Sequence, residues 1–198
     1  MLEARELACV RGERVVFARV SFRLAPGEAL LLTGANGAGK SSLLRLLAGL
    51  LPPAAGTLLW KGTDALADRA EHGRRLRFLS PQDALKPALT ARESLAFAAR
   101  LHGSDGVDAA LDSLGLLPLA ELPVRLLSTG QRRRLALARL ALAPAAPLWL
   151  LDEPTLGLDT ASVSRLRGLL AAHRDRGGAV VAATHLPLPL PGAAELRL

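Results

Sequence analysis

The sequence lacks several features that would place it among secreted proteins. Its 198 residues include no tyrosine and a single cysteine, Cys9. One cysteine cannot form an intramolecular disulfide, so the composition is typical of a protein in a reducing compartment. The first six residues contain no apolar core of the signal-peptide kind, and we expect no secretory signal. No uninterrupted apolar stretch reaches 18 residues, so we also expect no membrane-spanning helix.

Lysine is scarce although the chain is basic. The formal net charge is +7, yet only three of the 25 basic residues are lysine: Lys40, Lys61 and Lys86. A basic excess can indicate binding to nucleic acid or to acidic lipid. Here alanine, leucine, arginine and proline are frequent throughout, and we interpret the charge as a habit of composition.

One of those lysines belongs to a phosphate-binding pattern. Residues 34–41 read Gly-Ala-Asn-Gly-Ala-Gly-Lys-Ser and match the P-loop, G-x-x-x-x-G-K-[ST]. An apolar run at 28–33 predicts a buried strand before the loop, and residues 41–48 predict a helix after it. Glycines and a helix N-terminus present backbone N–H groups to phosphate oxygens. Lys40 would reach the β- and γ-phosphates, and Ser41 would bind Mg²⁺. A glycine-rich turn without function is the alternative.

The remaining pattern alternates strands and helices. Short runs at 7–10, 14–17 and 20–24, separated by turns, predict antiparallel strands near the N-terminus. Further strands are predicted at 57–60, 76–80, 147–152 and 178–184, and helices at 90–101, 107–114, 130–142 and 161–174. Thr90 and Glu93 form a predicted capping box. This alternation favours an α/β fold with a largely parallel sheet.

A second candidate for chemistry closes the strand at 147–152. There an apolar run ends in Asp152 and Glu153. Hydrolysis of a nucleoside triphosphate needs charge neutralisation by a metal and a positioned water. Asp152 would hold Mg²⁺, and Glu153 would act as general base on the water. Two surface carboxylates at a strand end are the alternative, which the upstream P-loop disfavours.

The stretch Leu127-Ser128-Thr129-Gly130-Gln131, followed by three arginines, resembles the signature of the ATP-binding cassette (ABC) ATPases. The chain carries that family's elements in the family's order: the P-loop, Gln82, Ser128 to Gln131, Asp152-Glu153, Leu158-Asp159 and His185. A P-loop kinase would not need the signature stretch. The resemblance implies one ABC nucleotide-binding domain over residues 1–198. Its fold would be α/β, with a RecA-like core, an N-terminal antiparallel β-subdomain and an inserted α-helical subdomain at about 83–142.

The resemblance also implies roles for residues. Gln82 would contact Mg²⁺ or the attacking water, and His185 would contact the γ-phosphate. Leu156 to Asp159 would couple two sites across a dimer, and Asp159 can also cap the next helix. Two chains would sandwich two ATP molecules, each between one P-loop and the other chain's signature. The expected nucleotide-binding residues are Gly34, Ala35, Asn36, Gly37, Ala38, Gly39, Lys40, Ser41, Ser42, Arg11, Ser128, Gly130 and Gln131, and the expected Mg²⁺-binding residues are Ser41, Gln82 and Asp152.

The chain departs from the family pattern at two positions. Thr129 replaces a signature glycine, which matters if the backbone there requires a positive φ. Many relatives stack adenine on an aromatic residue upstream of the P-loop, and by spacing Arg11 occupies that position. An arginine plane can stack on a base, so we expect Arg11 to contact adenine. An exposed arginine in a hairpin is the alternative.

Several stretches resemble the ATP-binding subunits of haem exporters that serve cytochrome c maturation. They are residues 2–14, 85–95, 128–140 and 184–188. This resemblance implies a homodimer on the cytoplasmic face of the bacterial inner membrane, bound to a membrane-embedded subunit of the cytochrome c maturation complex and to no nucleic acid. An ABC subunit for another solute, and an ABC ATPase that acts on nucleic acid, are the alternatives. The second usually needs another cassette or a long coiled coil, which the chain lacks.

Overall fold

A computed structural model describes residues 1–142 and 146–198 and contains two sheets. The larger sheet is parallel and has the strand order β6-β7-β8-β3-β9. Its strands are β3 (Ala29–Thr33), β6 (Leu76–Leu79), β7 (Leu148–Asp152), β8 (Ala179–Ala183) and β9 (Ala194–Arg197). Apolar side chains cover both faces of β7 and β8, as is usual for parallel strands between layers. The α/β fold expected from the sequence is confirmed.

The smaller sheet is antiparallel, with the order β2-β1-β4-β5. It consists of β1 (Leu2–Arg11), β2 (Arg14–Leu24), β4 (Ala55–Trp60) and β5 (Thr63–Asp64). The prediction of three short strands before the P-loop was wrong in number, because the two runs at 14–17 and 20–24 are one strand. Arg19 interrupts their alternation with a φ of 58° and a shift in register, so the strand is bulged but continuous.

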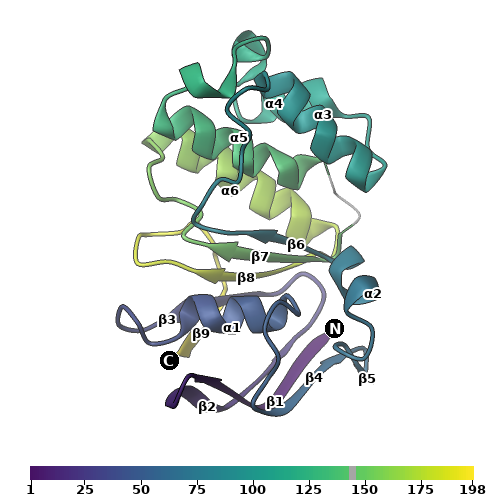
Figure 1. Cartoon of the computed structure of the whole chain (residues 1–198), viewed down its shortest axis with the longest axis vertical. Coiled ribbons are helices and arrows are strands. Elements are labelled where there is room, and N and C mark those ends of the chain that lie inside the picture. The colour runs from purple at the N-terminus through teal and green to yellow at the C-terminus, as the bar shows by residue number, and fades with distance from the viewer. Residues whose placement is uncertain (143–145) are drawn as a thin grey trace.

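The P-loop helix α1 (Lys40–Leu47) lies between the two sheets, as Figure 1 shows. Four of its leucines, Leu43, Leu44, Leu46 and Leu47, are fully buried. They share one core with the inner faces of both sheets, including Leu7, Leu58, Leu148 and Val181. A second core covers the opposite face of the parallel sheet, where Trp149 and Leu151 point. Alternation along β7 therefore directs Leu148, Leu150 and Asp152 toward α1.

Helices cover the other face of the parallel sheet (Figure 1). They are α3 (Ala91–His102), α4 (Val107–Ser113), α5 (Thr129–Ala141) and α6 (Thr160–Asp175), with the 3₁₀ turns η1 (Leu117–Leu119) and η2 (Val124–Leu126), and α2 (Arg69–Arg74) precedes β6. The predicted capping box at Thr90 and Glu93 is present and begins α3. None of the helices in the described parts of the chain is long and apolar enough to cross a membrane.

The last strand was not predicted. The proline-rich segment 187–191 is irregular, as expected, but β9 follows it and pairs with β3 from Leu30 to Thr33. This pairing brings Leu198 against the start of the P-loop, where the Leu198 N–H donates to the Thr33 carbonyl at 3.0 Å. The short alternation Ala-Glu-Leu-Arg at an exposed sheet edge is too weak a signal to separate from a loop.

A buried histidine supports the contact between α6 and the parallel sheet. His173 is 1% exposed, and its ring stacks on Trp149 with centroids 3.8 Å apart. A Cβ atom on Gly178 would lie 2.2 Å from the ring, so only glycine fits there. Burial lowers the pKa of His173 to about 4, and the Ala179 carbonyl at 3.3 Å only partly offsets this effect.

Acidification from pH 7 to pH 5 is expected to lower the free energy of unfolding by about 2 kcal/mol through His173. The pKa of His173 is about 4 in the folded chain against an ordinary 6.5, so the unfolded chain binds the proton first. The contribution is present above pH 6.5 and is lost as the pH falls toward 4. Urea unfolding at both pH values measures it. A His173→Leu variant should show a smaller difference between the two pH values, and an equal difference would contradict the assignment.

Candidate functional site

The P-loop joins the end of β3 to the start of α1. Gly34, Gly37 and Gly39 have φ values of 132°, 84° and 108°, which L side chains rarely adopt. Gly39 is the N-cap of α1 and supplies no side-chain cap, so the first N–H groups of the helix lack a side-chain acceptor. A loop of this shape presents several backbone donors to one anion.

Close packing fixes this loop on two sides. A Cβ on Gly39 would lie 2.7 Å from Cγ1 of Val16, and a Cβ on Gly34 would lie 2.6 Å from the Leu198 carbonyl oxygen. Strand β2 therefore contacts the loop through Val16. Arg11, the expected adenine contact, lies at the exposed end of β1 and pairs with Arg14 in the hairpin. Its contact with adenine stays a prediction, and Val16 is a residue beside the P-loop that sequence reasoning missed.

Lys40 folds back over the loop and is 8% exposed. Its Nζ donates to the carbonyl oxygens of Gly34 at 2.8 Å and Ala35 at 3.0 Å. These bonds hold the ammonium group inside the ring of residues 34–40. A phosphate bound in the loop would meet this positive charge together with the helix N-terminus.

Asp152 faces the P-loop helix and is 1% exposed. Burial raises the pKa of Asp152 above its ordinary value, a hydrogen bond from Ser41 lowers it, and the charge of Glu153 raises it again. Its Oδ2 atom is buried and has no hydrogen-bond partner among the residues that the structure describes. An unpaired carboxylate oxygen beside a serine hydroxyl fits Mg²⁺, which prefers hard oxygen ligands.

No group of three or more histidine, cysteine or acidic side chains able to hold a metal was found in the described ranges 1–142 and 146–198. That finding is compatible with a nucleotide-bound Mg²⁺. Such an ion takes one or two protein oxygens, and phosphates and water complete its octahedron. Asp152 and Ser41 would be the two protein oxygens here, and they adjoin the phosphate loop.

Glu153 and His185 meet at the ends of the neighbouring strands β7 and β8. The Glu153 Oε2 atom lies 3.0 Å from Nδ1 of His185 and also accepts a bond from the His185 N–H at 3.4 Å. The Glu153 side chain is 19% exposed and that of His185 is 53% exposed, so the pair is open to water. Register explains the meeting, because Asp152 pairs with Ala183 two residues before His185.

The signature residues lie at the surface, at the start of α5. Ser128 is exposed and caps the helix: its Oγ accepts from the Gln131 N–H at 3.2 Å, and the Gln131 side chain accepts from the Ser128 N–H at 2.8 Å. Thr129 has no positive φ, so its replacement of glycine strains nothing. In the parts of the chain that the structure describes, no hydrogen bond links Ser128 or Gln131 to residues 34–39. A phosphate at this helix end would come from outside the chain.

The segments that contain Gln82 and Asp159 lie in different surroundings. Gln82 is exposed in the turn after β6, where it lines a groove with residues of α3, and its role at the metal stays a prediction. Asp159 caps α6 by accepting the Ser162 N–H at 2.7 Å, which confirms the capping interpretation. A hydrogen bond from the Ser162 side chain, together with this backbone bond, lowers the pKa of Asp159. A Cβ on Gly130 would lie 3.1 Å from the Gly157 carbonyl, so the signature helix touches the segment before Asp159.

Sequence reasoning assigned no role to Arg133, which the structure places at the centre of the site. Its side chain is 4% exposed and contacts the segments after both β6 and β7. Helical spacing indicates that Arg133 is buried. It precedes the buried Ala136 and Leu137 by three and four positions and therefore shares their face of the helix. An arginine on the apolar face of a helix is a sign of a specific buried partner.

Known proteins resemble the chain over nearly its full length. Curated relatives include proteins named cytochrome c biogenesis ATP-binding export protein CcmA from Rhodospirillum rubrum and Paramagnetospirillum magneticum. The first is 57% identical over 98% of this chain and 83% of its own length, and the second is 53% identical over 98% and 92%. A solved dimeric ATP-binding cassette, MJ0796, in a post-hydrolysis state with ADP and phosphate, has a TM-score of 0.81. It is 27% identical over 94% of this chain and 88% of its own.

The match to a protein family covers most of the site. Residues 17–156 match the family described as ABC transporter, a range that includes the P-loop, the signature and the Asp152-Glu153 pair. The fold agrees with that of the solved cassette, and the curated relatives match nearly the whole chain. The chain belongs to the ABC transporter family and is one of its ATP-binding, ATP-hydrolysing subunits.

Proposed function

We propose that the chain hydrolyses ATP for a membrane complex that exports haem in cytochrome c maturation, at the cytoplasmic face of the bacterial inner membrane. The relatives named for cytochrome c biogenesis export, at 57% and 53% identity, support the pathway. One structural observation carries the chemistry: Lys40, Asp152 and the Glu153–His185 pair meet at the carboxyl edge of one parallel sheet. Ligands of open α/β sheets bind at that edge.

Each group of site residues has its own role in ATP hydrolysis. The N–H groups of residues 34–42 and the Lys40 ammonium bind the β- and γ-phosphates. Ser41 and Asp152, with Gln82, would hold Mg²⁺, which would neutralise charge on the phosphates. Glu153 accepts the proton of the attacking water. His185 donates to Glu153 and faces the γ-phosphate. It therefore fixes the position of the carboxylate relative to the phosphate.

A second chain completes each site. Ser128, with the half-buried Gly130 and the remainder of the α5 N-terminus, forms a donor set at the surface, and among the described residues no hydrogen bond links Ser128 or Gln131 to the same chain's P-loop. The solved relative described as a dimer with ADP and phosphate supports this arrangement. Two chains related by a two-fold axis would place each donor set on the other chain's γ-phosphate.

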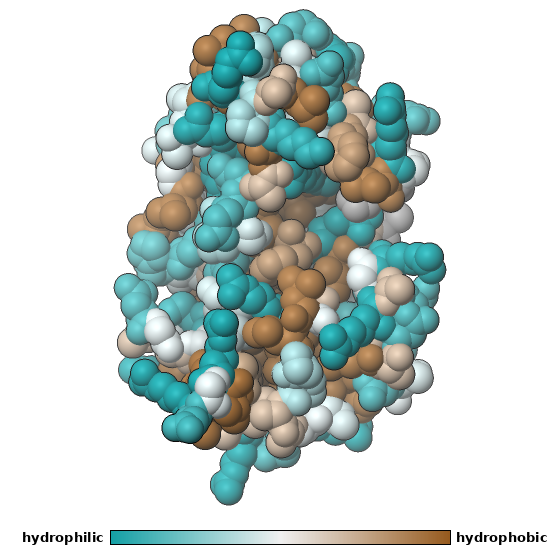
Figure 2. Space-filling view, in the orientation of Figure 1, coloured by the Kyte–Doolittle hydropathy of each residue, from teal (hydrophilic) through white to brown (hydrophobic). Residues whose placement is uncertain are grey.

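A groove supports docking of a membrane-embedded partner. The cavity has a volume of about 520 Å³ and lies between the turn after β6 and helices α3 and α5. Phe97 and Leu101 on α3 line it and are 53% and 68% exposed. Figure 2 shows apolar side chains gathered in a band over the middle of this face. Because Gln82 lines the same groove, a cytoplasmic segment seated there would touch the catalytic edge.

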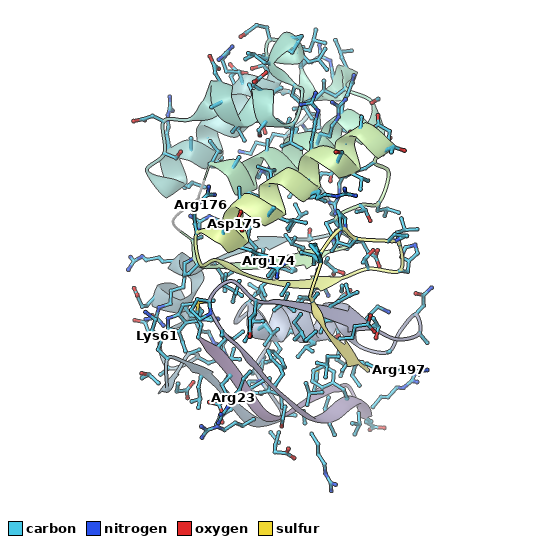
Figure 3. The ribbon with its side chains drawn as sticks, turned by 180° about the vertical axis from the view of Figure 1, so that it is seen from behind. Arg23, Lys61, Arg174, Asp175, Arg176 and Arg197 are labelled. Atoms are coloured by element: carbon cyan, nitrogen blue, oxygen red, sulfur yellow. The ribbon has the colours of Figure 1, made fainter. Side chains whose placement is uncertain are left out.

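The basic residues do not favour nucleic acid as the partner. Figure 3 labels Arg23, Lys61, Arg174, Arg176 and Arg197, which come from β2, the turn after β4, α6 and its end, and β9. These five residues come from separate elements and do not form one stripe of positive charge of the kind that follows a phosphate backbone. The proposal therefore includes no nucleic acid.

Co-purification separates the candidate tasks. The full chain, expressed in a bacterium that makes c-type cytochromes and solubilised from its membranes in mild detergent, is expected to retain a multi-span subunit and bound haem. Recovery with a membrane protein but without haem would favour another solute. Recovery with nucleic acid and no membrane protein would contradict the proposal.

A further inference from the structure

Arg133 on α5 connects two segments that end at the catalytic edge of the sheet. Its guanidinium lies between the turn after β6 and the end of β7, and 4% of its side chain is exposed. Nη1 donates to the Ser80 carbonyl at 2.9 Å, the Pro81 carbonyl at 3.4 Å and Oδ1 of Asp83 at 3.0 Å, and Nη2 donates to the carbonyls of Asp152 at 3.1 Å and Glu153 at 2.6 Å. One side chain thus holds both strand ends.

The bond to Glu153 bears on an unusual backbone. Glu153 has a φ of 50°, a left-handed conformation that a non-glycine residue adopts only when its surroundings hold it. Its N–H donates to the Ala183 carbonyl at 2.8 Å, and its carbonyl accepts from Arg133. These two bonds fix the peptide groups on either side of its Cα. They therefore set the direction in which the carboxylate leaves the chain toward His185.

The other half of the guanidinium holds the turn that carries Gln82. Arg133 binds Pro81 and Asp83, the neighbours of Gln82 on both sides. Asp83 is the acidic partner of this arginine and lines the groove described above. A displacement of the turn by a docked partner would thus act on Arg133 and, through it, on the backbone of Glu153.

The contacts of Arg133 require the forked shape of a guanidinium group. Two guanidinium nitrogens point to opposite segments at once, whereas an ammonium group concentrates its donors at one point. Ion pairs that are buried contribute little to stability on average, since desolvation offsets attraction. Arg133 is buried and donates to five acceptors, four of which are carbonyls at the catalytic edge. This arrangement points to a role in positioning those carbonyls.

We propose that Arg133 is a positioning residue for ATP hydrolysis, which fixes the Glu153 backbone and joins it to the turn 80–83. This inference rests on the role of Glu153 as general base. Arg133 touches neither the phosphates nor the water, so it acts through Glu153. Its loss should therefore affect turnover and leave ATP binding intact.

Arg133→Lys and Arg133→Gln variants of the full chain test the proposal. The kcat for ATP is expected to fall at least tenfold, with the KM and the ATP affinity within about twofold of wild type. Like a hydrolysis-deficient enzyme, each variant should accumulate ATP-bound dimers on gel filtration. Unchanged kcat in folded Arg133→Lys would overturn the proposal, and so would a loss of ATP affinity as large as the loss of kcat.

Two further variants keep the test decisive. If the Arg133 variants do not fold, Asp83→Asn, which weakens one of the five contacts, should still lower kcat several-fold without changing KM; wild-type kcat in Asp83→Asn would overturn the proposal. Arg174→Gln is the matched control. Arg174 also holds two carbonyls, those of Gly27 at 2.9 Å and Pro191 at 2.8 Å, but it lies on α6 at the far side of the molecule (Figure 3). Its loss should leave kcat unchanged.

The role of Glu153 is measured in parallel. Normal turnover in Glu153→Gln would remove the general base and, with it, the ground for this inference. Loss of turnover in Glu153→Gln together with normal turnover in Arg133→Lys would overturn the role of Arg133 alone.

Discussion

Replacing Glu153 with glutamine is expected to lower ATP hydrolysis by about 10²–10⁴-fold and to leave ATP binding intact. The amide cannot accept a proton from water, yet it matches the carboxylate in size and can still accept a bond from His185. Lys40, Ser41 and Asp152, the proposed ligands of the nucleotide and its metal, are unchanged. Phosphate release measures hydrolysis, and fluorescence of a labelled ATP measures affinity.

The same variant should form a dimer that persists in ATP and separates when ATP is removed. Two chains held by an unhydrolysed triphosphate stay joined, and gel filtration detects them. Glu195→Gln on β9 is the matched control, because Glu195 is an exposed glutamate at the edge of the same sheet. Turnover at the wild-type rate in Glu153→Gln would show that another group accepts the proton.

Mixing two inactive variants is expected to restore activity, because each site in the proposed dimer takes residues from two chains. Lys40→Ala removes a charged donor to the phosphates and should lower ATP affinity about 10–100-fold. Ser128→Arg places a long cation at the exposed start of α5, where a phosphate of the other chain would bind. In a mixed dimer one site carries both defects, and the other is complete.

Equal amounts of the two variants should give roughly a quarter of wild-type hydrolysis, since half of the dimers are mixed and each has one complete site of two. Lys40→Ala mixed with a Lys40→Ala, Ser128→Arg double variant is the control. That mixture contains no complete site and should stay inactive. If the first mixture stays as inactive as this control, the shared site is contradicted.

The fold and the sites were predictable where local sequence determines geometry. The P-loop, the strand before Asp152 and the capping box at Thr90 depend on spacing within a few residues, and the structure shows those elements. The sequence placed Glu153 and His185 at two strand ends, and the structure shows that the parallel sheet brings these ends together. The catalytic roles of Glu153, His185 and Gln82 themselves remain predictions.

What sequence could not give depends on contacts between distant segments. The pairing of β9 with β3 joins residues more than 160 positions apart, and four residues carry no pattern that selects a partner. The contacts of Arg133 span 50 positions to Asp83 and 20 to Glu153. Within a run of three arginines, only helical spacing indicates that Arg133 is buried. Only the folded structure shows which groups accept its hydrogen bonds.

The burial of α1 between two sheets affects the energetics of nucleotide capture. Its four leucines are fully buried, and Val16 and Leu198 pack against the glycines in front of it. A cradle that is already rigid loses little conformational freedom when a ligand arrives, so little of the intrinsic affinity is consumed in ordering the chain. A substitution that loosens this support, for instance Leu44→Ala, would therefore lower the affinity for the nucleotide. It would do so although Leu44 is remote from the phosphates and every phosphate donor is still present.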